Sequence, residues 1–276
     1  MSIDLSGRPI AITGASSGIG AATAIACARA GMPVALGARR TDKLDAIAAQ
    51  IRAAGGRALT LAADVTRPED CKALVDACVR EFGSIYAVYA NAGYGEESAL
   101  HLMPDERVRA MFETNFFGSL NVIRPALEHM LRNPGPPSQP RGHILWCSSC
   151  LARMSLPNYS IYCATKASQA HAATAMRHEL RPQGVHVSSV HPIGTRTEFF
   201  EQVQRRAGGE RTTITLPRHF YQTPEFVAKK TVQCLRRPRG EVWTGLSGVS
   251  VRTAMALAAM FPGMADWALA RISRKS

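Results

Sequence analysis

A tyrosine and a lysine stand four residues apart in the stretch YCATK, residues 162–166. The stretch opens a segment, residues 162–181, whose pattern predicts a helix, so both side chains project from one helix face. A free phenol has a pKa of about 10 and exchanges its proton poorly near neutral pH. An ammonium within a few ångströms favours the phenolate and lowers that pKa. Tyr162 and Lys166 are therefore a candidate acid–base pair, although the spacing alone also fits an ordinary helix surface.

A glycine-rich turn lies near the start of the chain, in TGASSGIG, residues 13–20. It follows a short apolar run and opens the first predicted helix, where backbone amides and a helix N-terminus hold a pyrophosphate. Gly14, Gly18 and Gly20 permit a tight turn and a close approach of phosphate to the backbone. The spacing is GxxxGxG rather than GxGxxG, so the position between strand and helix is what indicates a dinucleotide site.

Short apolar runs alternate with longer helical patterns along most of the chain. The runs are almost continuously apolar, as in strands that are buried on both faces. Their alternation with helices predicts right-handed crossovers and a parallel, doubly wound sheet. We therefore predict an α/β fold with a single Rossmann-type domain over residues 1–276. The predicted strands are 9–13, 33–38, 58–63, 85–90, 143–149, 186–191 and 241–245, and the predicted helices are 18–30, 42–54, 69–82, 105–132, 162–181 and 224–236.

The composition is typical of a globular chain, with 46% hydrophobic and 20% charged residues. The first residues show no basic segment before a long apolar run, and no stretch of about 20 residues is apolar enough to span a bilayer. The seven cysteines are scattered and odd in number, which favours reduced thiols and a cytoplasmic location. Cys147 and Cys150 form an isolated CxxC pair with no second ligand pair nearby, so no metal is expected.

The formal net charge is +12. Such a field attracts nucleic acid, anionic lipid or a phosphorylated ligand, but it equally describes a soluble surface rich in arginine. The basic residues are dispersed, and no recognition motif with interleaved aromatic residues accompanies them. Nucleic acid is therefore not expected as a partner.

Five motifs, in order along the chain, resemble those of the short-chain dehydrogenase/reductase family. They are TGASSGIG, NAG at 91–93, Asn115, Ser149 and YCATK, and the resemblance extends from about residue 8 to about residue 245. It implies an NAD(P)-dependent oxidoreductase that transfers a hydride between nicotinamide and a carbonyl or alcohol substrate. A non-catalytic, cofactor-binding regulator or scaffold of the same fold is the alternative, and the complete set of Tyr, Lys, Ser and Asn disfavours it.

The resemblance implies a role for each matching residue. Tyr162 is the general acid in carbonyl reduction and the general base in alcohol oxidation. Ser149 hydrogen-bonds the substrate oxygen, where negative charge develops. Lys166 also holds the nicotinamide ribose, and Asn115 anchors a water that relays protons to Lys166. Taken singly, each of these residues also has a structural explanation. The implied catalytic residues are Asn115, Ser149, Tyr162 and Lys166.

The cofactor contacts are implied in the same way. The pair at 64–65 contacts adenine, the NAG segment lines the cofactor, and residues 192–197 correspond to a loop that usually reads PGxxxT. Ile193 stands where that loop usually has glycine, which raises a question about the local turn. The implied cofactor-binding residues are Gly14, Ser16, Ser17, Gly18, Ile19, Gly20, Arg39, Asp64, Val65, Asn91, Ala92, Gly93, Tyr162, Lys166, Pro192, Thr195 and Thr197.

The end of the second predicted strand reads Gly37-Ala38-Arg39-Arg40. Sites that prefer NAD carry an acid there, which binds the ribose 2′-hydroxyl. We find no carboxylate available to repel a 2′-phosphate, and Arg39 is placed to pair with one. The alternative is that both arginines are solvated. The sequence therefore predicts NADP(H) as the cofactor.

Two segments are expected to contact substrate or partners. Residues 198–223 mix aromatic and basic side chains and, by the resemblance, form a substrate lid that suits a lipophilic or an acidic carbonyl compound. Residues 251–276 form an appendage with an apolar face, expected to be buried against the lid or a partner subunit. A peripheral membrane contact through this appendage is the alternative.

The chain is also expected to self-associate. The predicted helices at 105–132 and 162–181 carry apolar residues on more than one face. By the resemblance, these two helices pair across a two-fold axis, which makes the contact isologous and the protein a homodimer or homotetramer.

Overall fold

The computed structural model describes residues 2–132, 139–206 and 221–245, together with residues 253, 256, 257, 260, 261 and 263. In this part of the chain, seven strands form one parallel sheet in the order β3-β2-β1-β4-β5-β6-β7. The predicted parallel, doubly wound α/β fold is confirmed. The strands are β1 Ile10–Thr13, β2 Val34–Ala38, β3 Ala58–Ala62, β4 Ala87–Ala90, β5 Gly142–Cys147, β6 Val185–His191 and β7 Glu241–Trp243.

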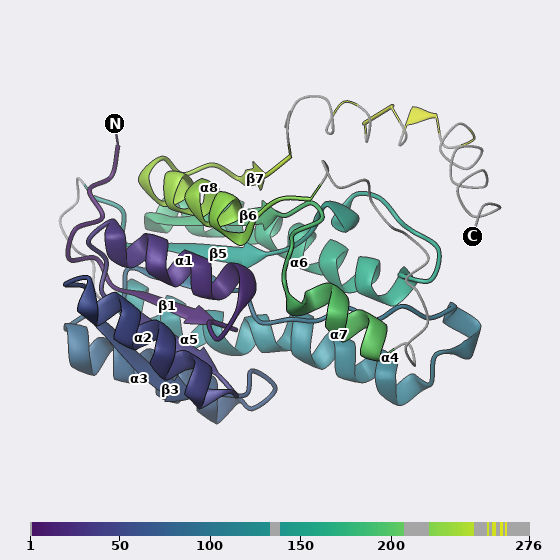
Figure 1. Cartoon of the computed structure of the whole chain (residues 1–276). Coiled ribbons are helices and arrows are strands. Elements are labelled where there is room, and N and C mark those ends of the chain that lie inside the picture. The colour runs from purple at the N-terminus through teal and green to yellow at the C-terminus, as the bar shows by residue number, and fades with distance from the viewer. Residues whose placement is uncertain are drawn as a thin grey trace.

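Helices cover both faces of the sheet (Figure 1). One hydrophobic cluster packs β1 and β2 against α1, α2 and α8, and a second packs β4 and β5 against α3, α5 and α6. Every residue of β1, β2, β4 and β5 is buried, which agrees with their continuously apolar sequences. The helices are α1 Gly18–Arg29, α2 Thr41–Ala53, α3 Pro68–Phe82, α4 Asp105–Phe112, α5 Gly118–Arg132, α6 Ser160–Leu180, α7 Glu198–Arg206 and α8 Pro224–Arg236.

The strand order reverses between β1 and β4, which lie side by side in the sheet. In open sheets of this type, ligands bind in the crevice at the carboxyl ends of the strands at such a reversal. The glycine-rich turn after β1 and the NAG segment after β4 both lie at this edge. In Figure 1, α7 lies beyond the end of the sheet toward which β1 points.

The helix predicted at 105–132 has the predicted outer bounds but is not uniform. A π-helical turn, Glu113–Phe117, separates α4 from α5. Such turns widen one turn of a helix and are often found at functional sites. Asn115 lies in the middle of this turn, so the irregularity fixes where its side chain and carbonyl point.

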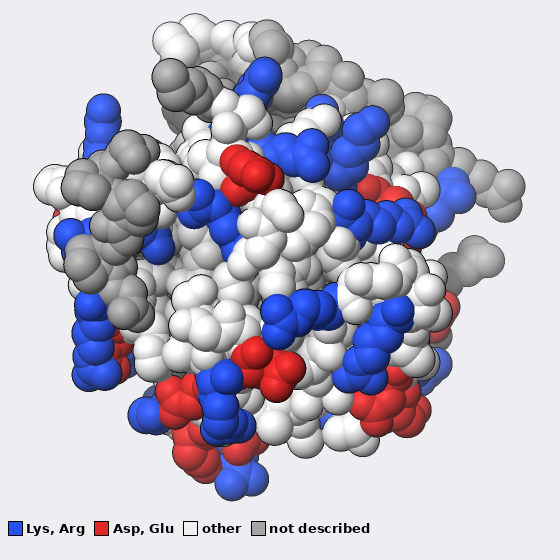
Figure 2. Space-filling model, turned by 90° about the vertical axis from the view of Figure 1, so that its left-hand side faces the viewer, with Lys and Arg blue, Asp and Glu red and all other residues white. Residues whose placement is uncertain are grey.

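The two peripheral segments are only partly described. The first residues of the predicted lid form α7, and Gln222 pairs with Thr195 as an isolated bridge, whereas residues 207–220 lie outside the described residues. Most of residues 251–276 also lie outside them. Among the helices that are described, none has the length and apolarity that a membrane span requires. Figure 2 shows one face of the molecule, where Lys and Arg side chains are spread with Asp and Glu between them.

Candidate active site

The glycine-rich turn has the conformation and the crowding that only glycine tolerates. Gly14 and Gly18 have φ of 65° and 56°, in the left-handed region. A Cβ at Gly20 would lie 2.3 Å from the carbonyl oxygen of Gly14. The turn delivers the chain from β1 into the N-terminus of α1, where unpaired backbone amides attract an anion. This cradle fits a pyrophosphate.

Asn91 fastens the turn to the neighbouring strand. Its side-chain amide donates to the carbonyls of Thr13, at 3.0 Å, and Gly14, at 3.3 Å. In return, the Thr13 hydroxyl accepts from the backbone amides of Asn91 and Ala92. The predicted NAG segment and the predicted phosphate turn are therefore one hydrogen-bonded unit.

The four predicted catalytic residues come together beneath this unit. Ser149 follows β5, Tyr162 and Lys166 lie on α6, and all three are buried. The Ser149 hydroxyl accepts from the amide of Leu151 at 3.1 Å. The ammonium of Lys166 lies 5.6 Å from the centre of the Tyr162 ring.

Asn115 uses its whole side chain to hold the loop after β4. Its Nδ2 donates to the carbonyl of Tyr94 at 2.9 Å and to the hydroxyl of Thr165 at 3.0 Å. Its Oδ1 accepts from the amide of Tyr94 at 2.9 Å. The structural explanation raised from the sequence, satisfaction of buried backbone, therefore describes this side chain.

A fully buried glutamine connects Lys166 to Asn115. The Lys166 ammonium donates to the carbonyl of Cys147 at 2.8 Å and to Oε1 of Gln169 at 3.1 Å. The Gln169 amide nitrogen donates to the backbone carbonyl of Asn115 at 2.5 Å and to the hydroxyl of Ser119 at 2.9 Å. Gln169 was not among the predicted site residues. The signal that could have found it is its position, one helical turn after Lys166 on the buried face of α6.

Of the two arginines after β2, it is not the predicted Arg39 that contacts the glycine-rich turn. Arg39 is 75% exposed, and its Nη1 lies 3.7 Å from a carboxylate oxygen of Asp64. It is Arg40 that turns to the glycine-rich turn, donating to the hydroxyls of Ser17 at 2.7 Å and Ser16 at 3.2 Å. Both predicted serines therefore lie at the site, with Arg40 as an additional basic residue.

A carboxylate is also present there, which the sequence expectation had excluded. Glu198, the first residue of α7, accepts from Nη1 of Arg40 at 2.7 Å and from the ammonium of Lys43 at 2.5 Å. Glu198 is 158 residues from Arg40 in the chain, so no local pattern could reveal the contact. The expectation that no carboxylate stands beside these arginines was wrong, because it considered only neighbours in sequence.

The loop after β6 brings three further residues to the site. Ile193 does not need a left-handed backbone, since Asn158 is the single residue other than glycine with positive φ in the described ranges. A Cβ at Gly18 would lie 3.0 Å from Cγ2 of Thr197. The predicted Thr197 therefore lies against the glycine-rich turn, called the phosphate turn below. The ring of Phe199 packs at a tilt against the ring of Tyr162, with 5.5 Å between the ring centroids.

Comparison with known proteins identifies the family of this chain. A family model described as short chain dehydrogenase matches residues 8–208. The chain belongs to the short-chain dehydrogenase family. An uncharacterized oxidoreductase of Listeria innocua is 31% identical over 233 residues, which are 84% of this chain and 91% of that protein. The 11-beta-hydroxysteroid dehydrogenase 1A of Arabidopsis thaliana is 36% identical over 191 residues, which are 68% of this chain and 52% of that protein.

Solved structures agree with the assignment. A short-chain dehydrogenase/reductase from Mycobacterium marinum is 31% identical with a TM-score of 0.76, over 87% of this chain and 94% of that one. A short chain dehydrogenase from Burkholderia cenocepacia in complex with NADP is 25% identical with a TM-score of 0.75, over 87% and 97% of the two chains. This short-chain dehydrogenase is therefore an oxidoreductase of a family whose members bind a nicotinamide cofactor.

The pKa of Tyr162 in this short-chain dehydrogenase is shifted opposite to the sequence expectation. Burial raises the pKa of the phenol, and the hydrogen bond from Ser149 opposes that rise without cancelling it. Lys166 does not supply the expected lowering, because its ammonium is turned toward the Cys147 carbonyl and Gln169. Burial also lowers the pKa of Lys166 itself.

Within the described residues, no group of three or more His, Cys, Asp or Glu side chains is arranged to hold a metal ion. Cys147 and Cys150 are free thiols, and burial raises the pKa of each.

The predicted adenine contact Asp64 accepts from the backbone amide of Thr66 at 3.0 Å and from its hydroxyl at 2.8 Å, which fixes the exit of β3 at the same edge.

Proposed function

We propose that this short-chain dehydrogenase reduces carbonyl compounds, or oxidises the corresponding alcohols, with NADP(H) as its cofactor. The observation that carries the proposal is the buried cluster of Ser149, Tyr162 and Lys166 at the carboxyl edge of the sheet, next to a phosphate turn lined by Arg40. The NADP-bound Burkholderia relative and the hydroxysteroid dehydrogenase relative support the cofactor and the type of reaction.

In the proposed mechanism, the phenol of Tyr162 donates a proton to the substrate oxygen during reduction and recovers it during oxidation. Ser149, buried with Tyr162 at the same edge of the sheet, donates to the same oxygen as negative charge develops there. A bound nicotinamide supplies or accepts the hydride. Lys166, held by the Cys147 carbonyl and Gln169 near the ring of Tyr162, would hold the nicotinamide ribose.

The NADP(H) preference rests on positive charge beside the phosphate turn. The predicted Arg39 is joined by Arg40, whose hydrogen bonds to Ser16 and Ser17 aim its guanidinium at the turn. A planar guanidinium suits a phosphate because it offers parallel donors. Replacing Arg40 by alanine should weaken NADPH binding and leave NADH binding nearly unchanged.

The experiment that tests the proposal is a screen of carbonyl and alcohol compounds with NADPH and NADP. We expect turnover of at least one compound, and Tyr162→Phe should lower kcat by about 100- to 10,000-fold while cofactor still binds. Cofactor binding without turnover of any compound, by either protein, would instead favour the non-catalytic regulator.

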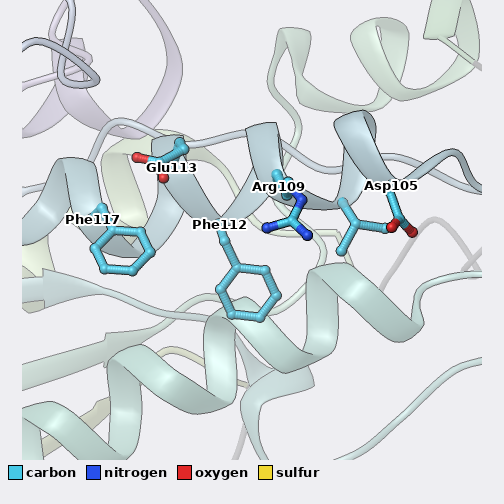
Figure 3. Close-up of a pocket in the computed structure, with 6 residues that line it drawn as sticks. Asp105, Arg109, Phe112, Glu113 and Phe117 are labelled. Carbon is cyan, nitrogen blue, oxygen red and sulfur yellow. The ribbon is translucent and has the colours of Figure 1, made fainter.

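We further propose a single domain and self-association through α4 and the π-helical turn. A groove of about 370 Å³ lies on this surface, and Figure 3 shows the rings of Phe112 and Phe117 projecting into it on the same side. Phe117 is 44% exposed and, with Phe112, gives the groove an apolar wall. A second copy of the chain covers such a face in the proposed homodimer or homotetramer. A cytoplasmic location is proposed with it.

A further inference from the structure

Three consecutive residues at the start of α7 contact three parts of the cofactor site. Thr197 lies against Gly18 of the phosphate turn, and Phe199 packs on the ring of Tyr162. Between them, Glu198 pairs with Arg40 and Lys43. The first turn of α7 therefore spans the site from its basic end to Tyr162.

The carboxylate of Glu198 occupies the donors that a 2′-phosphate needs. One guanidinium nitrogen of Arg40 donates a hydrogen bond to Glu198 and another donates to Ser16 and Ser17, while the Lys43 ammonium donates a hydrogen bond to Glu198. Both Arg40 and Lys43 are partly exposed, so an anionic ligand can reach them. A phosphate and a carboxylate cannot both lie against the same two cations without repelling each other.

We propose that Glu198 determines how strongly the enzyme distinguishes NADP(H) from NAD(H), by competing with the 2′-phosphate for Arg40 and Lys43. The proposal deepens the NADP(H) preference given above and rests on it. NADPH must displace Glu198 to bind fully, whereas NADH carries no group that contests these cations.

The competing carboxylate of Glu198 is charged at every pH used to assay the enzyme. Hydrogen bonds from Lys43 and Arg40 lower the pKa of Glu198 to about 2, against a smaller opposing effect of burial. Glu198 therefore carries the same charge between about pH 5 and pH 9, and the competition should weaken with added salt, because the groups are partly exposed.

The test compares Glu198→Gln with the wild type and with a matched control, Glu201→Gln. Glu201 lies one turn further along α7, is 69% exposed at its side chain and pairs with Arg205 at 3.9 Å. Dissociation constants are measured for NADPH and NADH, and for the fragments adenosine 2′,5′-bisphosphate and adenosine 5′-monophosphate.

We expect Glu198→Gln to tighten NADPH and the bisphosphate by about tenfold, since one like charge is removed. NADH and the monophosphate should change by less than about twofold, and Glu201→Gln should change nothing. Weaker NADPH binding in Glu198→Gln, or equal gains for both cofactors, would overturn the inference.

Failure of the underlying NADP(H) proposal gives a different result. It would appear as equal wild-type affinities for NADPH and NADH, and as no effect of Arg40→Ala on either.

Hydrogen exchange supplies a second measurement on the wild type. NADPH should raise the exchange of backbone amides at 198–202 and NADH should not. Equal changes with the two cofactors would contradict the competition.

Discussion

At the scale of single residues, the chemistry depends on a phenol whose pKa burial has raised. Tyr162 is therefore neutral well beyond neutral pH and is ready to donate a proton. Carbonyl reduction should be nearly constant between about pH 6 and pH 9, because the neutral phenol persists throughout that range. Alcohol oxidation needs the phenolate, whose fraction rises about tenfold per pH unit below the pKa.

Initial rates for one carbonyl and alcohol pair, measured in both directions against pH, check this prediction. Oxidation should increase steadily with pH while reduction stays level. A plateau in oxidation already below pH 8 would show that the phenol pKa in the working enzyme is lowered instead. In Tyr162→Phe, both directions should lose the activity that depends on this group.

A second prediction at this scale concerns Gln169. Replacing it by leucine leaves one Lys166 donor without its buried acceptor and removes one of two donors to the Asn115 carbonyl, which keeps the Ser119 hydroxyl. Each unpaired buried group costs about 1–3 kcal/mol in the free energy of unfolding. We expect a lower melting temperature and a lower kcat, because Lys166 loses its fixed position below Tyr162.

Thermal unfolding and steady-state kinetics measure the two effects. Ser168→Ala is the matched control, since Ser168 is the adjacent residue on α6 and its hydroxyl donates only to the exposed helix backbone in the contacts described. Gln169→Glu keeps an acceptor for Lys166 and adds a negative charge, so it should raise the pH at which oxidation sets in. A wild-type pH profile in Gln169→Glu would limit Gln169 to a structural role.

At the scale of elements, the sequence predicted all seven strands of the described sheet and most helices. These elements are specified locally, by apolar runs and by glycines such as Gly14 and Gly18. The π-helical turn around Asn115 was not predicted, because it depends on packing against α6 and on the hydrogen bond from Gln169. The contact of Glu198 with Arg40 was missed for the same reason, since it joins distant parts of the chain.

The turn between β1 and α1 allows a prediction that separates crowding from backbone strain. In Gly20→Ala, the new Cβ would lie 2.3 Å from the Gly14 carbonyl oxygen, so the turn must shift. Overpacking of this kind costs about 1–3 kcal/mol. We expect a loss of that order in the free energy of unfolding, together with weaker binding of both NADPH and NADH.

Gly83→Ala is the comparison for this turn. Gly83 ends α3 with φ of 81°, and nothing lies within 4 Å of a Cβ placed there. This variant suffers backbone strain alone, of about 1 kcal/mol, at a site away from the phosphate turn. Denaturant unfolding and cofactor titration should show instability in both variants but weaker cofactor binding in Gly20→Ala alone.

At the scale of the whole molecule, the groove on α4 and the π-helical turn predicts how copies associate. The groove combines apolar and charged lining, and its residues are Asp105, Val108, Arg109, Phe112, Glu113 and Phe117. The sequence expectation rested on the apolar residues of the predicted helix at 105–132, but one of them, Met111, is fully buried within its own chain. The surface available to a partner is therefore narrower than the apolar pattern of the helix suggested.

Phe117→Asp should dissociate the proposed oligomer, because it buries a carboxylate in an apolar contact repeated by the two-fold symmetry. Leu102→Asp is the matched control: Leu102 is 69% exposed and is not among the residues that line the groove. Light scattering at micromolar concentration should give a dimer or tetramer for the wild type and Leu102→Asp, and a smaller species for Phe117→Asp. A wild-type monomer would refute self-association, and an unchanged assembly in Phe117→Asp would place the interface elsewhere.

Dissociation should also lower turnover. Asn115 lies in the same π-helical turn and holds the loop after β4, so a partner that packs on this turn stabilises the loop beside Tyr162.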